Sequence, residues 1–175
     1  MKRNITLIGM MGSGKTTIAK ELAKSLSEFK LVDIDAEIEK SSGRKISEIF
    51  LKYGESYFRE LECAKIKFYT QLDNQIISAG GGAFENPDNR KFFLENSMVI
   101  FLKASAETIY DRIKAESHRP LLKKNFSLEK IQHILSLREK NYEKAHFVID
   151  TNGKTPYNIV EEILGVFNAW TLREN

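Results

Sequence analysis

The chain has 175 residues, of which 42% are hydrophobic and 29% are charged, and its formal net charge is +3. This length suits one domain, and a small net charge with interspersed signs argues against a nucleic-acid-binding protein. No apolar run approaches the ~20 residues that a membrane-spanning helix needs, and the single cysteine, Cys63, excludes a disulfide within the chain. We therefore expect a protein of the cytoplasm that binds neither nucleic acid nor a membrane.

Short apolar runs that are rich in β-branched residues predict five strands, at residues 5–8, 30–34, 75–79, 98–102 and 147–149. Most of these runs are apolar nearly throughout, which is typical of strands covered by helices on both faces. Helical periodicity fills the gaps, including residues 17–23, 55–72 and 127–145, and Thr155-Pro156 predicts the start of a last helix. The alternation predicts an α/β fold with a parallel sheet that binds ligands at the carboxyl ends of its strands.

The stretch GMMGSGKTT, which starts at Gly9, lies between the first predicted strand and a predicted helix. It matches the pattern G-x-x-x-x-G-K-[ST], in which glycines let backbone N–H groups converge on phosphate oxygens beside a helix N-terminus. Lys15 can reach the β- and γ-phosphates, and Thr16 can offer its hydroxyl to Mg²⁺. A flexible loop that matches by chance is the alternative, but the strand, helix and lysine are all in place. The loop therefore predicts a protein that binds a nucleoside triphosphate.

The second predicted strand runs into LVDIDAEIE, where Asp33 and Asp35 lie two residues apart. In an extended chain such residues point to the same side of the strand, so we expect the two carboxylates to share one face. Beside a loop that binds Mg·ATP, this pair suits metal binding and the orientation of a hydroxyl group. Asp35 as the N-cap of a helix over residues 36–40 is the alternative, and the two interpretations are compatible.

The third predicted strand, within QIISAGGGAF, ends in Gly80, Gly81 and Gly82. Glycines at a strand end leave the backbone open to a ligand, although a tight turn would also use them. We expect this strand to end beside the phosphate loop, which favours ligand contact.

Three arginines lie in motifs that suit anion binding. Arg59, in GESYFRELE, is surrounded by apolar residues, and snorkelling to solvent is its alternative interpretation. The stretch ESHRPLLKKNF is a polar, basic interruption long enough for a mobile lid, and its Arg119 could close over the phosphoryl group in transfer. Arg59 and Arg138, the latter in LREKNY, lie in predicted helices and could together grip a carboxylate.

Nucleotide binding alone permits a GTPase, a motor or a metabolite kinase. A GTPase usually carries an N-K-x-D signature, and neither Asn141 nor Asn152 begins one. A motor usually ends its third strand in Asp or Asp-Glu, where this chain has three glycines. The two arginines and the D-x-D pair favour a kinase that acts on an acidic polyol. A gluconate kinase and a nucleotide-dependent binding module without catalysis remain alternatives.

Six motifs together, GMMGSGKTT, DIDAEIE, GESYFRELE, GGGAF, RPLL and LREKNY, resemble the shikimate kinase family over nearly the whole chain. The resemblance implies phosphorylation of the 3-hydroxyl of shikimate by ATP with Mg²⁺, in aromatic amino-acid biosynthesis. It also implies a three-layer α/β sandwich with a five-stranded parallel sheet, as in nucleoside monophosphate kinases. Residues 1–175 would form a single P-loop kinase domain, with a substrate-binding region at about 36–62 and a lid at about 113–126. A monomer with only small-molecule partners is expected.

The same resemblance implies roles for individual residues. The ATP-binding residues would be Gly12, Ser13, Gly14, Lys15, Thr16, Thr17, Arg112, Arg119, Lys154 and Pro156. The shikimate-binding residues would be Asp35, Phe50, Phe58, Arg59, Gly80, Gly81, Gly82 and Arg138. Thr16 and Asp33 would serve the metal, Glu62 would orient Arg59, and Asp35, Lys15 and Arg119 would be catalytic. Lys154 stands where family members often have arginine, and a lysine cannot stack its head group flat on a base.

Overall fold

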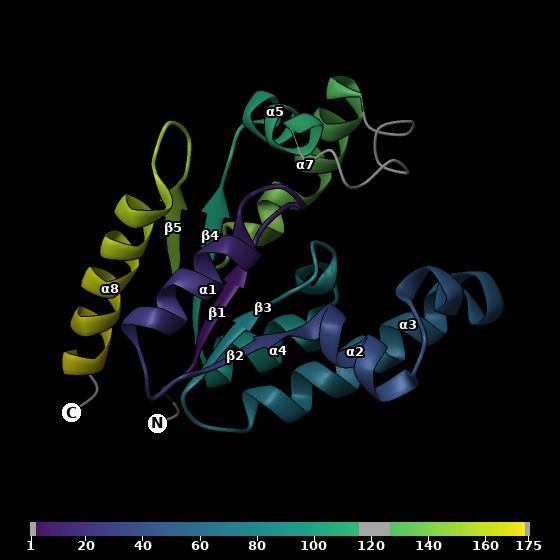
Figure 1. Cartoon of the computed structure of the whole chain (residues 1–175), viewed down its shortest axis with the longest axis horizontal. Coiled ribbons are helices and arrows are strands. Elements are labelled where there is room, and N and C mark those ends of the chain that lie inside the picture. The colour runs from purple at the N-terminus through teal and green to yellow at the C-terminus, as the bar shows by residue number, and fades with distance from the viewer. Residues whose placement is uncertain (1–2, 116–126, 174–175) are drawn as a thin grey trace.

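A five-stranded sheet forms the centre of the computed structural model, which describes residues 3–115 and 127–173 (Figure 1). The strands lie in the order β2-β3-β1-β4-β5, and all four neighbouring pairs are parallel. Their bounds are β1 Ile5–Ile8, β2 Lys30–Asp33, β3 Gln75–Ser78, β4 Met98–Lys103 and β5 Phe147–Asp150. The five predicted strands are confirmed, with ends that shift by one residue at most.

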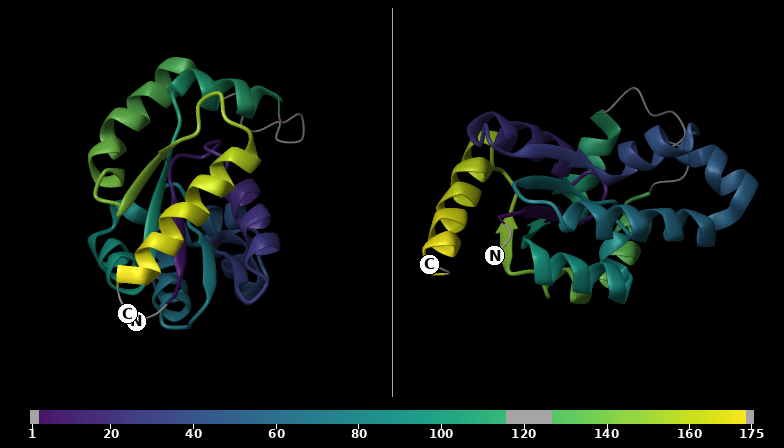
Figure 2. Two further views of the ribbon diagram at one scale, coloured as in Figure 1. Left: turned by 90° about the vertical axis from the view of Figure 1, so that its left-hand side faces the viewer. Right: turned by 90° about the horizontal axis from the view of Figure 1, so that it is seen from below.

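Helices connect the strands and cover both faces of the sheet (Figure 2). They are α1 Lys15–Ser25, α2 Ile34–Ser42, α3 Ile46–Thr70, α4 Pro87–Asn96, α5 Ala106–Ala115, α7 Leu128–Tyr142 and α8 Pro156–Arg173, with a short 3₁₀ helix η1 at Ala83–Glu85. None of the described helices is long and apolar enough to cross a membrane.

The strands send alternate side chains into two separate apolar layers, as the two-residue period of a strand requires. On one face, Ile5 and Leu7 of β1 pack in a cluster with apolar residues of α1 and α8. On the other face, Ile8 of β1 packs in a cluster with residues of α2, α3, α4 and α7. Because both faces are buried, the central strands are apolar nearly throughout, with Thr6, Gln75 and Ser78 as buried polar exceptions, and the predicted three-layer sandwich is confirmed.

Helix α3 begins earlier than the predicted helix at residues 55–72 and contains a kink. Gly54 has φ 82° and ψ 176°, a conformation essentially restricted to glycine, and it divides α3 into two helical halves. The second half carries Phe58 and Ile66 into the core, whereas the first half projects away from the sheet (Figure 1). The first half was missed because it buries Ile49 in the core but leaves Phe50, Leu51 and Tyr53 exposed, so its apolar residues do not keep to one face.

The two ends of the described chain lie on the side where β1 starts (Figures 1 and 2). The Arg3 guanidinium lies 5.8 Å from the centre of the Phe29 ring, and that ring lies 5.6 Å from the ring of Phe167 in α8. The phosphate loop leaves β1 at the opposite, carboxyl edge of the sheet. This edge holds the candidate site.

Candidate active site

A cleft of about 870 Å³ lies at the carboxyl edge of the sheet. It brings together segments that are far apart in the chain, because parallel strands all end at this edge. Its walls are residues 11–18, Asp33, Asp35, residues 78–82, Arg112, Ile113, Arg138, Lys154, Pro156 and Ile159. The set includes most of the residues predicted to bind ATP and the acceptor. Arg119 and residues 116–126 of the predicted lid lie outside the described residues.

The phosphate loop fills the turn between β1 and α1. Gly12 has φ 83°, and a Cβ there would lie 3.0 Å from Cγ1 of Ile113, so both the backbone and the packing require glycine. Gly9 has φ 140°, and its Cβ would lie only 2.8 Å from the carbonyl oxygen of Leu102. Helix α1 starts at Lys15 and directs its free N–H groups and partial positive charge toward the cleft. This geometry suits a bound phosphate group.

Lys15 is nearly buried and is held by the phosphate loop itself. Its Nζ donates hydrogen bonds of 2.9 Å to the carbonyl oxygens of Gly9 and Met10. Burial lowers the pKa of Lys15 to about 8, although the nearby carboxylates of Asp35 and Asp33 act to raise it. A phosphate anion in the cleft would favour the charged lysine, so nucleotide binding and protonation of Lys15 are coupled.

Asp33 ends β2 and caps the helix that follows it. Its Oδ1 accepts a hydrogen bond of 3.2 Å from the backbone N–H of Ala36, and its Oδ2 accepts one of 3.5 Å from the hydroxyl of Thr16. The cap of α2 is therefore Asp33, and the alternative that assigned this cap to Asp35 is wrong. Asp33 is both the last residue of β2 and the N-cap of α2. The helix therefore begins directly at Ile34.

The prediction that Asp33 and Asp35 share one face of an extended strand is also wrong. Asp35 lies in the first turn of α2, yet it still reaches the cleft. Its Oδ1 is buried and has no hydrogen-bond partner among the residues that the structure describes. Burial and the charge of Asp33 raise the pKa of Asp35, against the opposing effects of Lys15 and Arg59. A partly desolvated carboxylate with a free oxygen is suited to accept a hydrogen bond from an alcohol.

The glycine turn, residues 80–82, follows β3 and runs close to this carboxylate. A Cβ on Gly80 would lie 3.2 Å from Oδ1 of Asp35, and a Cβ on Gly82 would lie 3.0 Å from Nη2 of Arg59. The missing side chains therefore let charged groups approach the backbone closely. Strand β3 pairs directly with β1, so the turn lies beside the phosphate loop, as predicted.

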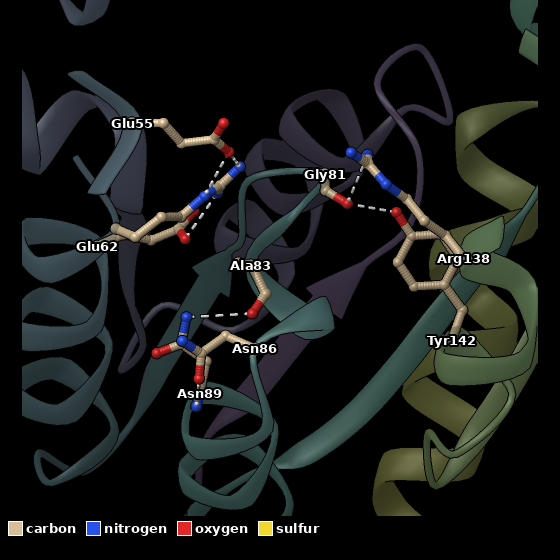
Figure 3. Close-up of polar contacts among 9 residues, drawn as sticks. Glu55, Glu62, Gly81, Ala83, Asn86, Asn89, Arg138 and Tyr142 are labelled. Carbon is tan, nitrogen blue, oxygen red and sulfur yellow. Dashed lines mark hydrogen bonds and ion pairs between the residues drawn. The ribbon is translucent and has the colours of Figure 1, made fainter. Parts of the chain in front are cut away.

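Arg59 stands in the second half of α3 between two carboxylates. Its Nη1 donates to Glu62 at 2.9 Å, and its Nε and Nη2 donate to Glu55 at 3.2 and 3.0 Å (Figure 3). Only 1% of Glu62 is exposed, and the expected contact between Glu62 and Arg59 is present. Burial acts to lower the pKa of Arg59, but its hydrogen bonds to Glu62 and Glu55 raise it overall. The guanidinium is thus fixed and charged beside the glycine turn.

Arg138 approaches the glycine turn from the other side, on α7. Its Nη1 donates to the carbonyl oxygen of Gly81 at 3.2 Å, and Tyr142 of the same helix donates to that oxygen as well (Figure 3). Two guanidinium groups from α3 and α7 therefore flank one glycine turn, an arrangement that suits a carboxylate. Tyr142 was not predicted, because nothing in the local sequence marks a contact with a residue so far away in the chain.

Phe50 and Phe58 pack together with ring centres 4.8 Å apart. Phe58 is buried and Phe50 is partly exposed, and neither is among the residues that line the cleft. Arg59 is likewise absent from the lining, where Gly82 stands in front of it. The structure thus places these three predicted residues next to the cleft rather than in its wall.

On the far side of the phosphate loop, Arg112 joins two segments. Its Nη1 donates to the carbonyl oxygen of Ser13 at 3.1 Å, and its Nη2 donates to the carbonyl oxygen of Thr151 at 2.9 Å. Lys154 forms a 2.6 Å ion pair with Glu162 of α8. Both side chains line the cleft, but each is occupied with protein partners in this structure.

Thr16 and Asp33 fit a magnesium site because they present two hard oxygen atoms from different elements. Among residues 3–115 and 127–173, no group of three or more His, Cys, Asp or Glu side chains could hold a metal. Magnesium usually takes few protein ligands and completes its shell with water and phosphate oxygens, so this small donor set suits it.

Comparisons with known proteins agree with this geometry. The sequence profile of the Shikimate kinase family matches residues 11–168. The chain is 47% identical over 163 residues to a shikimate kinase of Persephonella marina, covering 93% of this chain and 98% of that protein. It is 44% identical over 162 residues to a shikimate kinase of Thermodesulfovibrio yellowstonii, covering 93% of each.

Solved structures give the same result. A shikimate kinase from Acinetobacter baumannii, in complex with shikimate, superposes with a TM-score of 0.87 at 32% identity, covering 97% of this chain and 94% of that one. A gluconokinase from Sinorhizobium meliloti has a TM-score of 0.65 at 17% identity, covering 95% of this chain and 92% of that one. The second likeness shows a common fold alone, and the first agrees with the curated relatives. This chain therefore belongs to the shikimate kinase family.

Proposed function

We propose that this chain transfers the γ-phosphoryl group of ATP to the 3-hydroxyl of shikimate, in the pathway to aromatic amino acids. One observation carries the proposal: the glycine turn is flanked by Arg59 and Arg138, and it lies between the phosphate loop and the free oxygen of Asp35. An acceptor carboxylate bound at the turn would leave its ring hydroxyls facing Asp35. Membership of the family supports the same reaction.

The phosphate side of the cleft would be occupied by ATP. The amides of residues 12–17 and the charged Lys15 would hold the phosphates, while Arg112, Lys154 and Pro156 would lie toward the base. Arg112 and Lys154 would need to exchange some of their protein contacts for nucleotide contacts. Arg119 remains a prediction for the transferring phosphoryl group.

Thr16 and Asp33 would hold Mg²⁺, which supplies positive charge to the phosphate oxygens when it is bound. The chain's own residues do the rest: Lys15 neutralises the phosphates, and Asp35 orients the acceptor hydroxyl and accepts its proton at a carboxylate oxygen. Phosphoryl transfer depends mainly on positioning and electrostatics, so little further chemistry is needed. A monomer in the cytoplasm stays a prediction.

The test of this function is a coupled assay of ADP release with shikimate, shikimate methyl ester, gluconate, AMP or no acceptor. We expect efficient turnover of shikimate, slower turnover of its methyl ester, and none with gluconate, AMP or no acceptor. The ester offers Arg59 and Arg138 no negative charge, so transition-state stabilisation should fall by at least ~2–3 kcal/mol, which lowers kcat/KM about 30- to 150-fold. Equal turnover of acid and ester would show that Arg59 and Arg138 do not recognise the carboxylate. Faster turnover of gluconate would favour the gluconate kinase alternative.

A further inference from the structure

The carbonyl oxygen of Gly81 accepts hydrogen bonds from two side chains of α7. One donor is Nη1 of Arg138, at 3.2 Å, and the other is the hydroxyl of Tyr142. A carbonyl oxygen has two lone pairs and can accept both at once. The two donors differ in one respect, because Arg138 lines the cleft whereas Tyr142 is fully buried. One donor is thus available to a ligand, and the other can only serve the protein.

Tyr142 is fixed in place by its surroundings. None of its surface is exposed, and its ring lies 4.9 Å from the ring of Phe101 in β4. Burial raises the pKa of Tyr142 overall, although the charge and hydrogen bonding of Arg138 act to lower it, so the hydroxyl stays protonated and remains a donor at neutral pH. Asn141 beside it donates to Glu85 of η1 at 2.9 Å. Arg138, Asn141 and Tyr142 lie at i, i+3 and i+4, so one face of α7 holds the segment after β3 at Gly81 and Glu85.

The glycine turn needs such an anchor. Three consecutive glycines leave the backbone with more freedom than any other sequence would, and no side chain of their own can fix it. In a planar trans peptide, the C=O and the following N–H point in opposite directions. Turning the Gly81 carbonyl toward Tyr142 therefore turns the Gly82 N–H away from α7. The orientation of this one peptide depends on which donors hold the carbonyl.

We propose that Tyr142 is a positioning residue that holds the Gly81 peptide in place and thereby frees Arg138 to bind the substrate carboxylate. Without substrate both donors share the carbonyl. When Arg138 turns to a carboxylate, Tyr142 still donates to the Gly81 carbonyl, so this partly buried oxygen keeps a hydrogen-bond partner. Without the Tyr142 hydroxyl, Arg138 would be the one side-chain donor left to the Gly81 carbonyl among the described residues. Binding of a carboxylate by Arg138 would then leave that carbonyl without a side-chain donor, which costs free energy. This inference rests on the proposed role of Arg138.

The experiment compares Tyr142→Phe with the wild-type protein, using shikimate and its methyl ester as acceptors. The substitution keeps the ring and removes only the donor. We expect KM for shikimate to rise about tenfold, with kcat within about threefold of wild type, because Arg138 must then leave the partly buried Gly81 carbonyl in order to bind the carboxylate. KM for the methyl ester, which cannot recruit Arg138 through a charge, should change less than about twofold. The ratio of kcat/KM for shikimate to kcat/KM for its methyl ester should therefore fall.

Phe101→Leu is the matched structural control. It loosens the packing around the Tyr142 ring but leaves the hydroxyl, so we expect a lower melting temperature and an unchanged preference for the acid. If Tyr142→Phe lowers turnover of acid and ester equally, or if Phe101→Leu narrows the preference to the same degree, Tyr142 acts through packing and the proposal fails. A wild-type protein that uses acid and ester equally would overturn the Arg138 assignment itself and the role of Tyr142 with it.

A second measurement uses the intact protein in case Tyr142→Phe does not fold. The chain has six tyrosines, and ¹³C labelling at tyrosine Cζ makes each hydroxyl visible by NMR. Replacing the other five by phenylalanine, one at a time, assigns the signal of Tyr142. We expect this signal to move when shikimate draws Arg138 away from Gly81 and to stay in place with the methyl ester. A signal that is unmoved by both, in a protein that prefers shikimate to its methyl ester, would overturn the proposal.

Discussion

At the scale of single residues, Asp33 and Asp35 show how two identical side chains acquire different tasks. Asp33 is partly exposed, bonded to Thr16 and to the start of α2. Asp35 is largely buried and keeps one oxygen free, and its pKa is raised mainly by burial. Because the two carboxylates lie on different elements, each can be substituted separately, although removing the charge of Asp33 also removes one cause of the raised pKa of Asp35. The difference between them can therefore be tested directly.

We predict opposite responses to magnesium from Asp35→Asn and Asp33→Asn. A positioned base typically contributes ~10²–10⁴-fold, so Asp35→Asn should lower kcat by about that factor and leave Mg·ATP binding nearly intact. Asp33→Asn keeps a good N-cap, since asparagine caps as well as aspartate, and should raise the Mg²⁺ concentration needed for half-maximal rate. Mg²⁺ titrations at saturating ATP and shikimate measure both. If excess Mg²⁺ restored the rate of Asp35→Asn but not that of Asp33→Asn, Asp35 would be the metal ligand and the two roles would be reversed.

Lys15 makes nucleotide binding depend on pH. Its pKa of about 8 in the nucleotide-free protein means that the lysine loses its charge above pH 8, whereas bound phosphates favour the charged form. Binding then requires uptake of a proton, and the affinity for a non-hydrolysable ATP analogue should fall by up to about tenfold per pH unit above 8. Calorimetry between pH 7 and 9.5 measures this affinity. Shikimate is the control ligand because guanidinium groups stay charged in this range, and a pH-independent nucleotide affinity would contradict the prediction.

At the scale of elements, the kink in α3 depends on one glycine. Gly54 has a Gly-only backbone conformation, but nothing lies within 4 Å of where its Cβ would be, so the cost of Gly54→Ala comes from the backbone alone. We expect a loss of about 1–3 kcal/mol in the free energy of unfolding. Gly165→Ala in α8 is the matched control, since its added Cβ also meets open space and its φ is not in the left-handed range. It should stabilise by roughly 0.5–1 kcal/mol.

Urea unfolding of both glycine variants provides the comparison. If Gly54→Ala proves neutral while Gly165→Ala stabilises, the two halves of α3 can join without the special conformation at residue 54. Since Phe58 and Arg59 follow the kink directly, we also expect Gly54→Ala to raise KM for shikimate more than KM for ATP.

The sequence specified the elements better than their junctions. The central strands were predictable because they are buried and apolar nearly throughout, and the phosphate loop because its positive-φ positions favour glycine. The position of Asp35 could not be predicted, because a single hydrogen bond from the Ala36 N–H to the Asp33 side chain decides where β2 ends and α2 begins. Contacts between distant elements, such as that of Tyr142 with Gly81, leave no local pattern and needed the structure.

At the scale of the whole molecule, burial is distributed unevenly. All residues of β1 and nearly all of β4 are buried, whereas residues 50–57 of α3 are exposed. Segments with few buried contacts open at low free energy, and central strands exchange only through global unfolding. We therefore predict fast amide hydrogen exchange in residues 50–57 and the slowest exchange in β1 and β4. Exchange mass spectrometry of the ligand-free protein measures this, and uniform protection across these segments would contradict it.

The packing of Arg3 on Phe29, and of Phe29 on Phe167, has a practical consequence. The start of β1 and the last turns of α8 lie together at the edge of the sheet that faces away from the cleft (Figure 2). A short peptide linker would therefore span the two ends, and chains with neighbouring ends commonly tolerate circular permutation. An affinity tag or a fluorophore attached at either end would stay clear of both substrates, so immobilised or labelled protein should keep the activity of the free chain.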